Sequence, residues 1–213
     1  RGYFLFPPPP QELDLLRFPL VEMADKDETR NLARRFDLQV AAKPDSQDIC
    51  FVPDGKYAAV IEKLRPGAAE PGDICHEDGA ILGRHEGIIH YTIGQRRGLG
   101  IASDRPLYVA KIDAGKNRIV VSDKDNLFSK GLIASDFNFS LDDAIDSPRK
   151  VKAKIRLNQN ETGATVFPTK DKTVNIVFDQ PQMAVSPGQS VALYLDDVVL
   201  GGGIIKRAIT PSQ

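Results

Sequence analysis

The chain has 213 residues, of which 41% are hydrophobic and 27% charged, a composition typical of a globular protein and not of a disordered one. A chain of this length can bury a core large enough to fold without disulfides or a structural metal. Its 28 Lys and Arg residues are balanced by 29 Asp and Glu residues, which excludes a uniformly basic surface for nucleic acid and leaves only local patches.

Cysteine content and hydropathy indicate the compartment. Two cysteines are too few for a disulfide framework. The sequence has no apolar run of membrane-spanning length and no basic-then-apolar signal segment at its start. We therefore expect a cytoplasmic protein with no membrane partner. Because the chain opens with Arg1 and not with methionine, we also expect a piece of a longer protein.

The first 65 residues predict helices. The prolines at 7–10 break any regular structure before them. Asp25 and Glu28 then have capping-box spacing, which predicts a helix start. A second helix is predicted after Asp54 and should end at Pro66-Gly67. Its apolar side chains recur with helical spacing at Tyr57, Val60, Ile61 and Leu64.

Beyond residue 66 the apolar pattern changes to the alternation of strands. Turn-forming residues at 77–79, 114–117 and 195–197 separate short apolar runs. The runs 108–112 and 118–121 predict a hairpin around the second turn, and further strands are expected at 174–178, 191–194 and 198–200. This pattern favours a small barrel or sandwich over a parallel α/β sheet. We place a domain boundary near 128–130.

Cys50 is the first residue that could carry chemistry. A thiol acts as a nucleophile or sulfur carrier only as the thiolate, which needs access and a positive neighbour. Asp45 and Asp48 disfavour that anion, whereas Lys43 favours it. The alternative is a buried cysteine in an apolar strand, since Ile49 lies beside it.

The loop 94–100, with sequence Gly-Gln-Arg-Arg-Gly-Leu-Gly, combines backbone freedom with two guanidinium groups that suit phosphate. It matches neither a Walker loop nor a dinucleotide fingerprint. A ligand-binding loop and a glycine-rich turn with solvated arginines both remain open.

The segment 150–157 alternates cations with apolar residues, so a strand here would place four cations on one face. Such a row could contact successive phosphates of a nucleic acid. A sheet edge protected by lysines is the alternative. The cationic positions are Lys150, Lys152, Lys154 and Arg156, and the apolar positions expected to face a core are Val151, Ala153, Ile155 and Leu157.

The three histidines do not predict a metal site. There is no Cys-x-x-Cys pair and no helical pair of histidines four residues apart, so we expect no zinc. His90 lies in an apolar run and is interpreted as a hydrogen-bonded structural histidine. The segments 186–190 and 200–204 are interpreted as turns.

Six short motifs, in order along the whole chain, resemble the tRNA-specific 2-thiouridylases, a bacterial family formerly labelled tRNA (5-methylaminomethyl-2-thiouridylate)-methyltransferases. Each motif is weak alone, but six in the same order and spacing are highly specific. They are Tyr3-Phe4-Leu5, Asp45-Ser46-x-x-Ile49-Cys50-Phe51, Gly83-x-His85-x-Gly87, Thr92-x-Gly94-Gln95-Arg96-x-Gly98-Leu99-Gly100, Pro187-Gly188-Gln189-Ser190 and Leu200-Gly201-Gly202-Gly203.

The resemblance implies a tRNA sulfurtransferase that converts wobble uridine to 2-thiouridine. In this family an N-terminal ATP-pyrophosphatase domain uses ATP to adenylate the C2 oxygen. Sulfur then arrives as a persulfide on the cysteine that corresponds to Cys50. A second family cysteine forms a transient disulfide with it, and Cys75 does not match that cysteine. The implied partners are tRNA and a sulfur-donor protein, either a persulfide relay or a cysteine desulfurase.

The family's ATP-binding loop, of the Ser-Gly-Gly-x-Asp-Ser type, is missing from this sequence. The resemblance therefore implies the carboxy-terminal portion of the enzyme, inactive alone. Its expected fold is mostly β, α+β overall. Residues 1–65 would be the helical tail of the nucleotide-binding α/β domain and carry the persulfide cysteine. Residues 66–128 would form a small β-rich central domain and 129–213 an antiparallel β-barrel.

The resemblance also assigns residues to tRNA binding. Arg156 and Gln189 match family positions that contact tRNA, and Leu157 stands where relatives often have an aromatic residue. Gln95, Arg96 and Arg97 are expected to form an RNA-binding or interdomain loop.

Two other functions remain open. One is a non-catalytic β-barrel module that binds RNA or protein. The other is the methyl transferase of the old family label, but the sequence lacks a glycine-rich strand-to-helix turn for a methyl donor.

Overall fold

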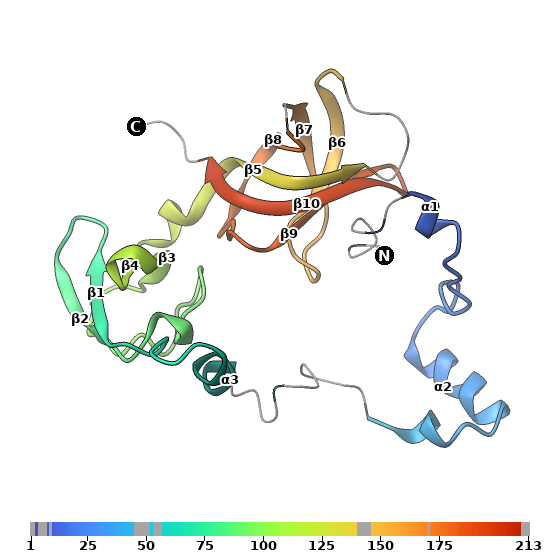
Figure 1. Cartoon of the computed structure of the whole chain (residues 1–213), viewed down its shortest axis with the longest axis horizontal. Helices are drawn as coiled ribbons and strands as arrows, with labels where there is room; N and C mark the ends of the chain where they lie inside the picture. The colour runs from blue at the N-terminus through green and yellow to red at the C-terminus, as the bar shows by residue number, and fades with distance from the viewer. Residues whose placement is uncertain are drawn as a thin grey trace.

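The computed structural model describes residues 3, 8, 10–44, 52, 57–139, 146–169 and 171–209. Their strands form a four-stranded sheet and a closed six-stranded barrel (Figure 1). The mostly β fold class with a C-terminal antiparallel barrel is therefore confirmed. No helix in the described ranges is long and apolar enough to cross a bilayer. The α-helices precede the first strand and are α1 (Pro10–Leu13), α2 (Lys26–Arg35) and α3 (Tyr57–Leu64).

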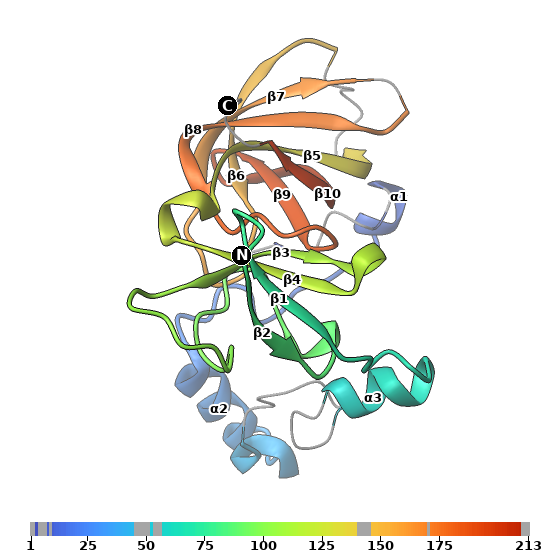
Figure 2. The same ribbon diagram turned by 90° about the vertical axis from the view of Figure 1, so that its left-hand side faces the viewer.

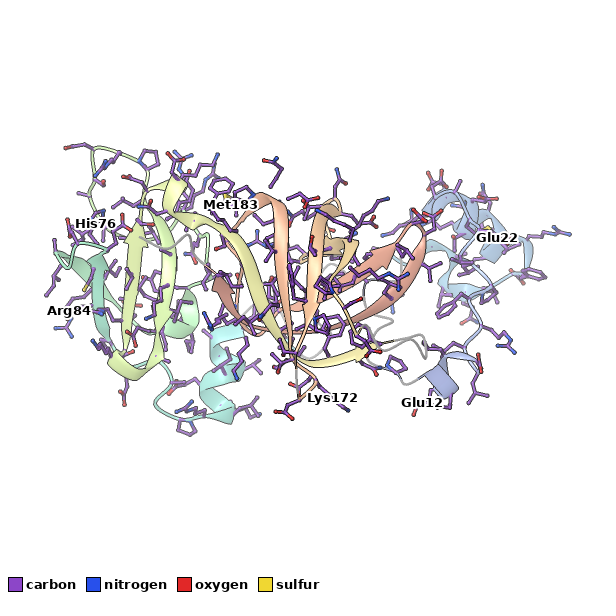
Figure 3. All side chains as sticks on the ribbon, turned by 90° about the horizontal axis from the view of Figure 1, so that it is seen from above. Glu12, Glu22, His76, Arg84, Lys172 and Met183 are labelled. Atoms are coloured by element: carbon purple, nitrogen blue, oxygen red, sulfur yellow. The ribbon has the colours of Figure 1, made fainter. Side chains whose placement is uncertain are left out.

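The capping-box prediction for α2 is confirmed. The Asp25 side chain accepts a hydrogen bond from the backbone N–H of Glu28 at 2.9 Å. The Glu28 carboxylate in turn accepts from the N–H of Ala24 at 2.8 Å. The helix nevertheless has no buried residue, and Phe36 beside it is 64% exposed. Figures 1 and 3 show α2 standing away from both sheets, so this part of the chain presents its apolar side chains to solvent.

The second predicted helix is α3, which ends at Leu64 just before Pro66-Gly67 as expected. Gly67 has a φ of +84°, a backbone conformation that favours glycine over other residues. The predicted cap, Asp54, lies outside the described residues.

The four-stranded sheet has the order β2-β1-β4-β3. The predicted hairpin is β3–β4, with Asn117 in the left-handed conformation between the two strands. The predicted turn at 77–79 joins β1 to β2. The central pair, β1 and β4, runs parallel, and the other neighbours are antiparallel. The strands are β1 (Gly72–His76), β2 (Ile81–His85), β3 (Tyr108–Asp113) and β4 (Arg118–Ser122).

The structural histidine of this sheet is His85 and not His90, which is exposed. His85 is 2% exposed, and its Nδ1 accepts the N–H of Gly87 at 3.1 Å. Its Nε2 lies 3.2 Å from the carbonyl oxygen of Asn117. Because Nδ1 accepts, the ring is assigned the tautomer in which Nε2 carries the proton and donates it to Asn117. Sequence pattern pointed to His90 because of its apolar neighbours, but burial selects the histidine at the end of β2.

The barrel is closed, and every neighbouring pair of its strands is antiparallel. Side chains such as Leu132, Ile176 and Leu193 fill its interior and are fully buried. Figure 2 shows the barrel above the four-stranded sheet, to which η5 (Lys124–Leu127) connects it. In the order β10-β5-β8-β7-β6-β9, the strands are β5 (Phe128–Phe139), β6 (Arg149–Lys154), β7 (Thr162–Pro168), β8 (Val174–Met183), β9 (Ser190–Leu195) and β10 (Val198–Ile209).

The glycines at 201–203 lie within β10, so the turn predicted for 200–204 is wrong. A methyl group on Gly201 would collide with the Asn138 carbonyl oxygen of β5, and one on Gly203 would meet the Ser135 carbonyl oxygen. The pairing of β10 with β5 shifts register in this stretch. These glycines therefore allow two strands to approach closely at an irregularity and do not reverse the chain. The turn expected at 195–197 is confirmed, with Asp196 at a φ of +51°.

Close approach inside the barrel gives a stability prediction. A methyl group on Gly131 would collide with the Ile176 carbonyl oxygen of the neighbouring strand. We expect Gly131→Ala to lower the free energy of unfolding by roughly 1–3 kcal/mol, as overpacking does. The control is Gly115→Ala, where the added carbon would have only an Asp113 side-chain oxygen at 3.7 Å. Gly115→Ala should be neutral or stabilising by up to about 1 kcal/mol. Urea unfolding of both variants measures the difference, and equal effects would contradict the steric explanation.

Candidate functional site

Three of the residues assigned to RNA contact line one pocket of about 470 Å³. Arg156 and Leu157 follow β6, and Gln189 precedes β9. Tyr3, far away in the sequence, forms another part of the wall. The complete lining is Tyr3, Arg156, Leu157, Asn158, Gly188, Gln189 and Ser190. The structure thus brings together residues from three separate segments.

The Arg156 guanidinium is held by the carbonyl oxygen of Ala184. Its Nη2 donates a hydrogen bond to that oxygen at 2.7 Å. The same oxygen accepts from the Ser186 hydroxyl at 3.0 Å, and the N–H of Ala184 donates to Leu127 at 2.8 Å. Within the described part of the chain, Arg156 has no carboxylate partner. Its position is therefore fixed while its positive charge stays available to an anion.

The predicted alternation along β6 is confirmed as far as Ile155. Val151, Ala153 and Ile155 belong to the barrel core, and Lys150 and Lys152 are exposed. β6 pairs with β7 on one side and β9 on the other, so the alternative of lysines protecting an open sheet edge is wrong.

Leu157 was expected to face the core, and this expectation is wrong, because the side chain is 56% exposed. The strand ends at Lys154, and the N–H of Gln159 donates to the Arg156 carbonyl oxygen at 3.3 Å. The alternation of a strand therefore stops before Leu157. The resulting turn places Leu157 in the pocket wall beside Arg156.

Gln189 lies in the turn predicted at 186–190, and this turn is present between β8 and β9. Two backbone hydrogen bonds fix it to β10. The N–H of Gly188 donates to the Ile205 carbonyl oxygen, and the N–H of Ile205 donates to the Gln189 carbonyl oxygen, both at 2.8 Å. The Gln189 side chain is exposed, so a rigid backbone presents an accessible amide.

Tyr3 closes the pocket against β9. Its ring is 6% exposed and packs against Ala192 and Tyr194, and its hydroxyl donates to the Ser190 carbonyl oxygen at 2.6 Å. Burial raises the pKa of the Tyr3 hydroxyl and the neighbouring Tyr194 adds to the rise, whereas the positive charge of Arg156 opposes it. The phenol therefore stays protonated, and able to donate, at neutral pH.

The side chain of Gln95 stabilises loop 94–100 through two hydrogen bonds to the neighbouring backbone. The Gln95 side-chain oxygen accepts from the N–H of Thr92 at 3.0 Å, and its side-chain nitrogen donates to the Arg97 carbonyl oxygen at 2.9 Å. Arg96 and Arg97 are exposed and form no ion pair within the described ranges. Gln95 is thus engaged by its own loop, and the two arginines are available to a ligand.

The same loop lies beside the pocket. A Cβ atom built on Gly94 would lie 2.9 Å from the Cβ of Ala184 and 4.0 Å from Nη2 of Arg156. Figure 3 shows Met183, the residue before Ala184, on the side of the barrel facing the four-stranded sheet. Loop 94–100 and the Arg156 pocket therefore meet at the Ala184 peptide.

Of the two cysteines, Cys75 lies within the described residues and Cys50 does not. Cys50 and the rest of its motif, residues 45–51, lie outside the described residues. Cys75 is 3% exposed within β1. Among described residues, no group of three His, Cys, Asp or Glu side chains could hold a metal ion.

The residue patterns did not identify every member of the site. Tyr3 occurs in one of the six motifs, but nothing in its neighbourhood predicts contact with a strand almost two hundred residues later. Ala184 carries no sequence signal at all, although its φ of +54° is unusual for alanine. Asn158 and Ser190 could have been suspected only as neighbours of Arg156 and Gln189.

Three family models match consecutive parts of the chain. The tRNA methyl transferase HUP domain matches residues 1–54. The tRNA methyl transferase PRC-barrel domain matches residues 60–123, and the aminomethyltransferase beta-barrel domain matches residues 129–205.

Curated relatives match over nearly the whole chain. The tRNA-specific 2-thiouridylase MnmA of Hyphomonas neptunium is 47% identical over 220 residues, covering 100% of this chain and 55% of the relative. The protein of the same name from Ruegeria pomeroyi is 47% identical, covering 97% and 56%. That from Rickettsia felis is also 47% identical, covering 98% and 57%. The chain thus spans about half the length of these relatives.

In loop 94–100, Gln95 stabilises the backbone through its side chain, whereas Arg96 and Arg97 are exposed. Gln95→Glu keeps the acceptor for Thr92 but places a carboxylate against the Arg97 carbonyl oxygen. We expect it to lower the free energy of unfolding by about 1 kcal/mol, the usual net value of a lost hydrogen bond. Arg96→Gln, at an exposed position, should change it by less than about 0.5 kcal/mol. Thermal unfolding of both variants tests this, and the reverse order would show that Arg96 braces the loop.

Proposed function

The chain belongs to the tRNA-specific 2-thiouridylase family, and on that premise we propose that it forms the tRNA-binding and sulfur-delivering part of an enzyme that converts wobble uridine to 2-thiouridine. The observation that carries the proposal is the shared pocket of Arg156, Leu157 and Gln189. Residues assigned to tRNA contact from two distant segments meet there around a guanidinium that has no acidic partner in the described ranges.

The pocket has the chemistry of nucleic-acid binding. An arginine binds phosphate through charge-assisted hydrogen bonds, an exposed amide offers both a donor and an acceptor, and the exposed Leu157 offers apolar contact to a base. Lys150, on the same outward face as Arg156 in sequence register, is instead paired with Asp179 at 2.6 Å. Lys150 is therefore neutralised by its neighbour, whereas Arg156 keeps its positive charge for an anion. We propose that Arg96 and Arg97 extend the same RNA-binding surface from the four-stranded sheet.

The proposed chemistry assigns Cys50 the role of sulfur carrier. Uridine C2 is a poor electrophile until activation by ATP makes its oxygen part of an AMP leaving group. The outer sulfur of a Cys50 persulfide then bonds to C2 as the C2–O bond breaks and AMP leaves. The second family cysteine, in the portion of the relatives that this chain does not span, then attacks the Cys50 sulfur, so that the S–S bond breaks, the outer sulfur stays on C2 and a disulfide forms with Cys50. A thiol reductant returns both cysteines to thiols. Transfer requires the uridine to be extruded from the stacked anticodon loop and held close to the cysteine away from water. The persulfide is replenished by a sulfur-donor protein.

The division of labour follows the three matched models. We propose that residues 1–65 complete a nucleotide-binding domain whose ATP site lies in the portion of the relatives that this chain does not span. The exposed apolar side chains around α2, among them Phe36 and Val40, support this, since they suit contact with the remainder of such a domain. Residues 66–128 and 129–213 then form the central domain and the barrel that bind tRNA.

Removing the guanidinium tests the pocket. We expect Arg156→Ala to weaken tRNA binding by this chain and to flatten its dependence on salt by about 0.7–0.9 in the slope of log K against log [salt] for each lost phosphate contact. The control is Lys150→Ala, because Lys150 is already neutralised by Asp179. Titration of labelled tRNA at several NaCl concentrations measures both slopes. An unchanged slope in Arg156→Ala would remove this pocket from phosphate binding.

Replacing each cysteine tests the sulfur carrier. In cells carrying the full-length gene, Cys50→Ser should abolish 2-thiouridine while leaving ATP-dependent adenylation intact, because only the sulfur carrier is lost. Cys75→Ala, at a buried position of β1, should leave thiolation in place. Mass spectrometry of the wobble nucleoside is the measurement. Normal thiolation in Cys50→Ser cells would favour a non-catalytic binding module, and 2-thiouridine made by this chain alone would contradict the proposed division of labour.

A further inference from the structure

We propose that Tyr3 is a positioning residue that holds the Gln189 turn in its RNA-binding geometry and so couples the first segment of the chain to the barrel pocket. The inference rests on the proposed function, because it concerns how the same pocket is formed. It adds a residue from outside the barrel to that pocket and gives it a role that does not require contact with the RNA.

The first support is the hydrogen bond between Tyr3 and Ser190. The Tyr3 hydroxyl donates to the Ser190 carbonyl oxygen at 2.6 Å. Ser190 directly follows Gln189, whose own carbonyl oxygen accepts the N–H of Ile205 at 2.8 Å. The two peptide groups that follow Gln189 and Ser190 are therefore both fixed, the first by β10 and the second by Tyr3. Losing the Tyr3 bond would leave the turn held from one side only.

The second support is the position of the Tyr3 ring. Along β9, Val191 and Leu193 point into the barrel core, whereas Ala192 and Tyr194 form a separate buried cluster with Tyr3. Ala192 and Tyr194 thus lie on the outer side of β9, where Tyr3 covers them. Tyr3 also lines the pocket directly. Tyr3 therefore packs on the strand and also lines the pocket that contains Arg156 and Gln189.

A second attachment fixes the same segment farther round the barrel. The Asn138 side-chain nitrogen, at the end of β5, donates to the Pro8 carbonyl oxygen at 3.0 Å. β10 lies between β9 and β5 in the barrel order, so the two attachments flank it. The first segment is therefore attached at two points separated by a strand.

The attachment has a functional consequence. Residues 1–54, which match one domain model, include both Tyr3 and Cys50, whereas Arg156 and Gln189 belong to the part that matches the barrel model. The pocket is complete only when the segment that contains Tyr3 is docked on the barrel. By linkage, RNA in the pocket and docking of that segment stabilise each other.

The structure offers a matched control in Tyr194. It belongs to the same cluster and is 3% exposed, but among the residues that the structure describes its hydroxyl has no hydrogen-bond partner. Tyr3→Phe removes a hydroxyl bonded to the Gln189 turn, and Tyr194→Phe removes an unbonded one a short distance away. Both variants keep the aromatic ring, so the packing of the cluster is preserved in each.

A double-mutant cycle on tRNA binding tests the role of Tyr3. Tyr3→Phe should weaken binding by about three- to tenfold, the effect of one hydrogen bond, and Tyr194→Phe should leave it unchanged. In the double variant, Tyr3→Phe should weaken tRNA binding little beyond the effect of Gln189→Ala, because both substitutions act through the side-chain amide of Gln189. A purely structural tyrosine would instead lower thermal stability while the folded protein bound tRNA normally. Additive effects of Tyr3→Phe and Gln189→Ala, or equal effects of the two Phe variants, overturn the inference.

Hydrogen exchange gives a readout that does not depend on RNA. Backbone amides at 188–190 should exchange faster in Tyr3→Phe and at the wild-type rate in Tyr194→Phe. Unchanged exchange in Tyr3→Phe overturns the inference even if the chain binds tRNA through Arg156. A different outcome is faster exchange in Tyr3→Phe while neither Arg156→Ala nor Tyr3→Phe changes the affinity for tRNA. This outcome overturns the proposed function of the pocket, and with it any role of Tyr3 in RNA binding.

Discussion

The peptide group of Ala184 connects the parts of this protein on which the candidate site depends. Its carbonyl oxygen accepts from Arg156 and Ser186, and its N–H donates to Leu127 in the link between the two sheets. The same residue contacts the Gly94 turn. One peptide in an uncommon backbone conformation thereby orients the guanidinium, fixes the start of the Gln189 turn and joins the barrel to loop 94–100. Such a conformation costs free energy, which the surrounding hydrogen bonds offset.

A site built in this way explains how a nearly neutral protein can be suited to an anionic partner. The chain has a formal net charge of −1, so attraction must be local. Arg156 bonds to the Ala184 carbonyl oxygen, and Gly94 of the loop that carries Arg96 and Arg97 lies against Ala184. These three arginines have no carboxylate partner in the described ranges, whereas Lys150 in β6 is paired with Asp179. Arrangement of the charges, and not their number, makes this region basic. An uneven distribution of this kind also orients a bound polyanion relative to the rest of the molecule.

The sequence was informative where local chemistry decides structure. The cap of α2 at Asp25, the β3–β4 hairpin and the inward positions Val151 and Ala153 follow from spacing alone, because each depends on neighbours within a few residues. The sequence pattern gave wrong predictions where contacts between distant segments determine the structure. The glycines at 201–203 form no turn because β5 lies against them, and Leu157 leaves the core because β6 ends early. The contact of Tyr3 with Ser190 joins opposite ends of the chain and has no local signal. For the same reason, the motifs supplied Arg156 and Gln189 as separate residues, and only the fold showed that they share a pocket.

Closure of the barrel between its first and last strands has a consequence for how the protein is made. β5 begins at Phe128, and its partner β10 does not end until Ile209. While the ribosome is still translating the last strand, β5 and β9 each lack a neighbour and expose unpaired backbone groups. The nascent barrel therefore passes through an interval in which it can pair with another chain, and completion of the final dozen residues of the sheet ends that interval.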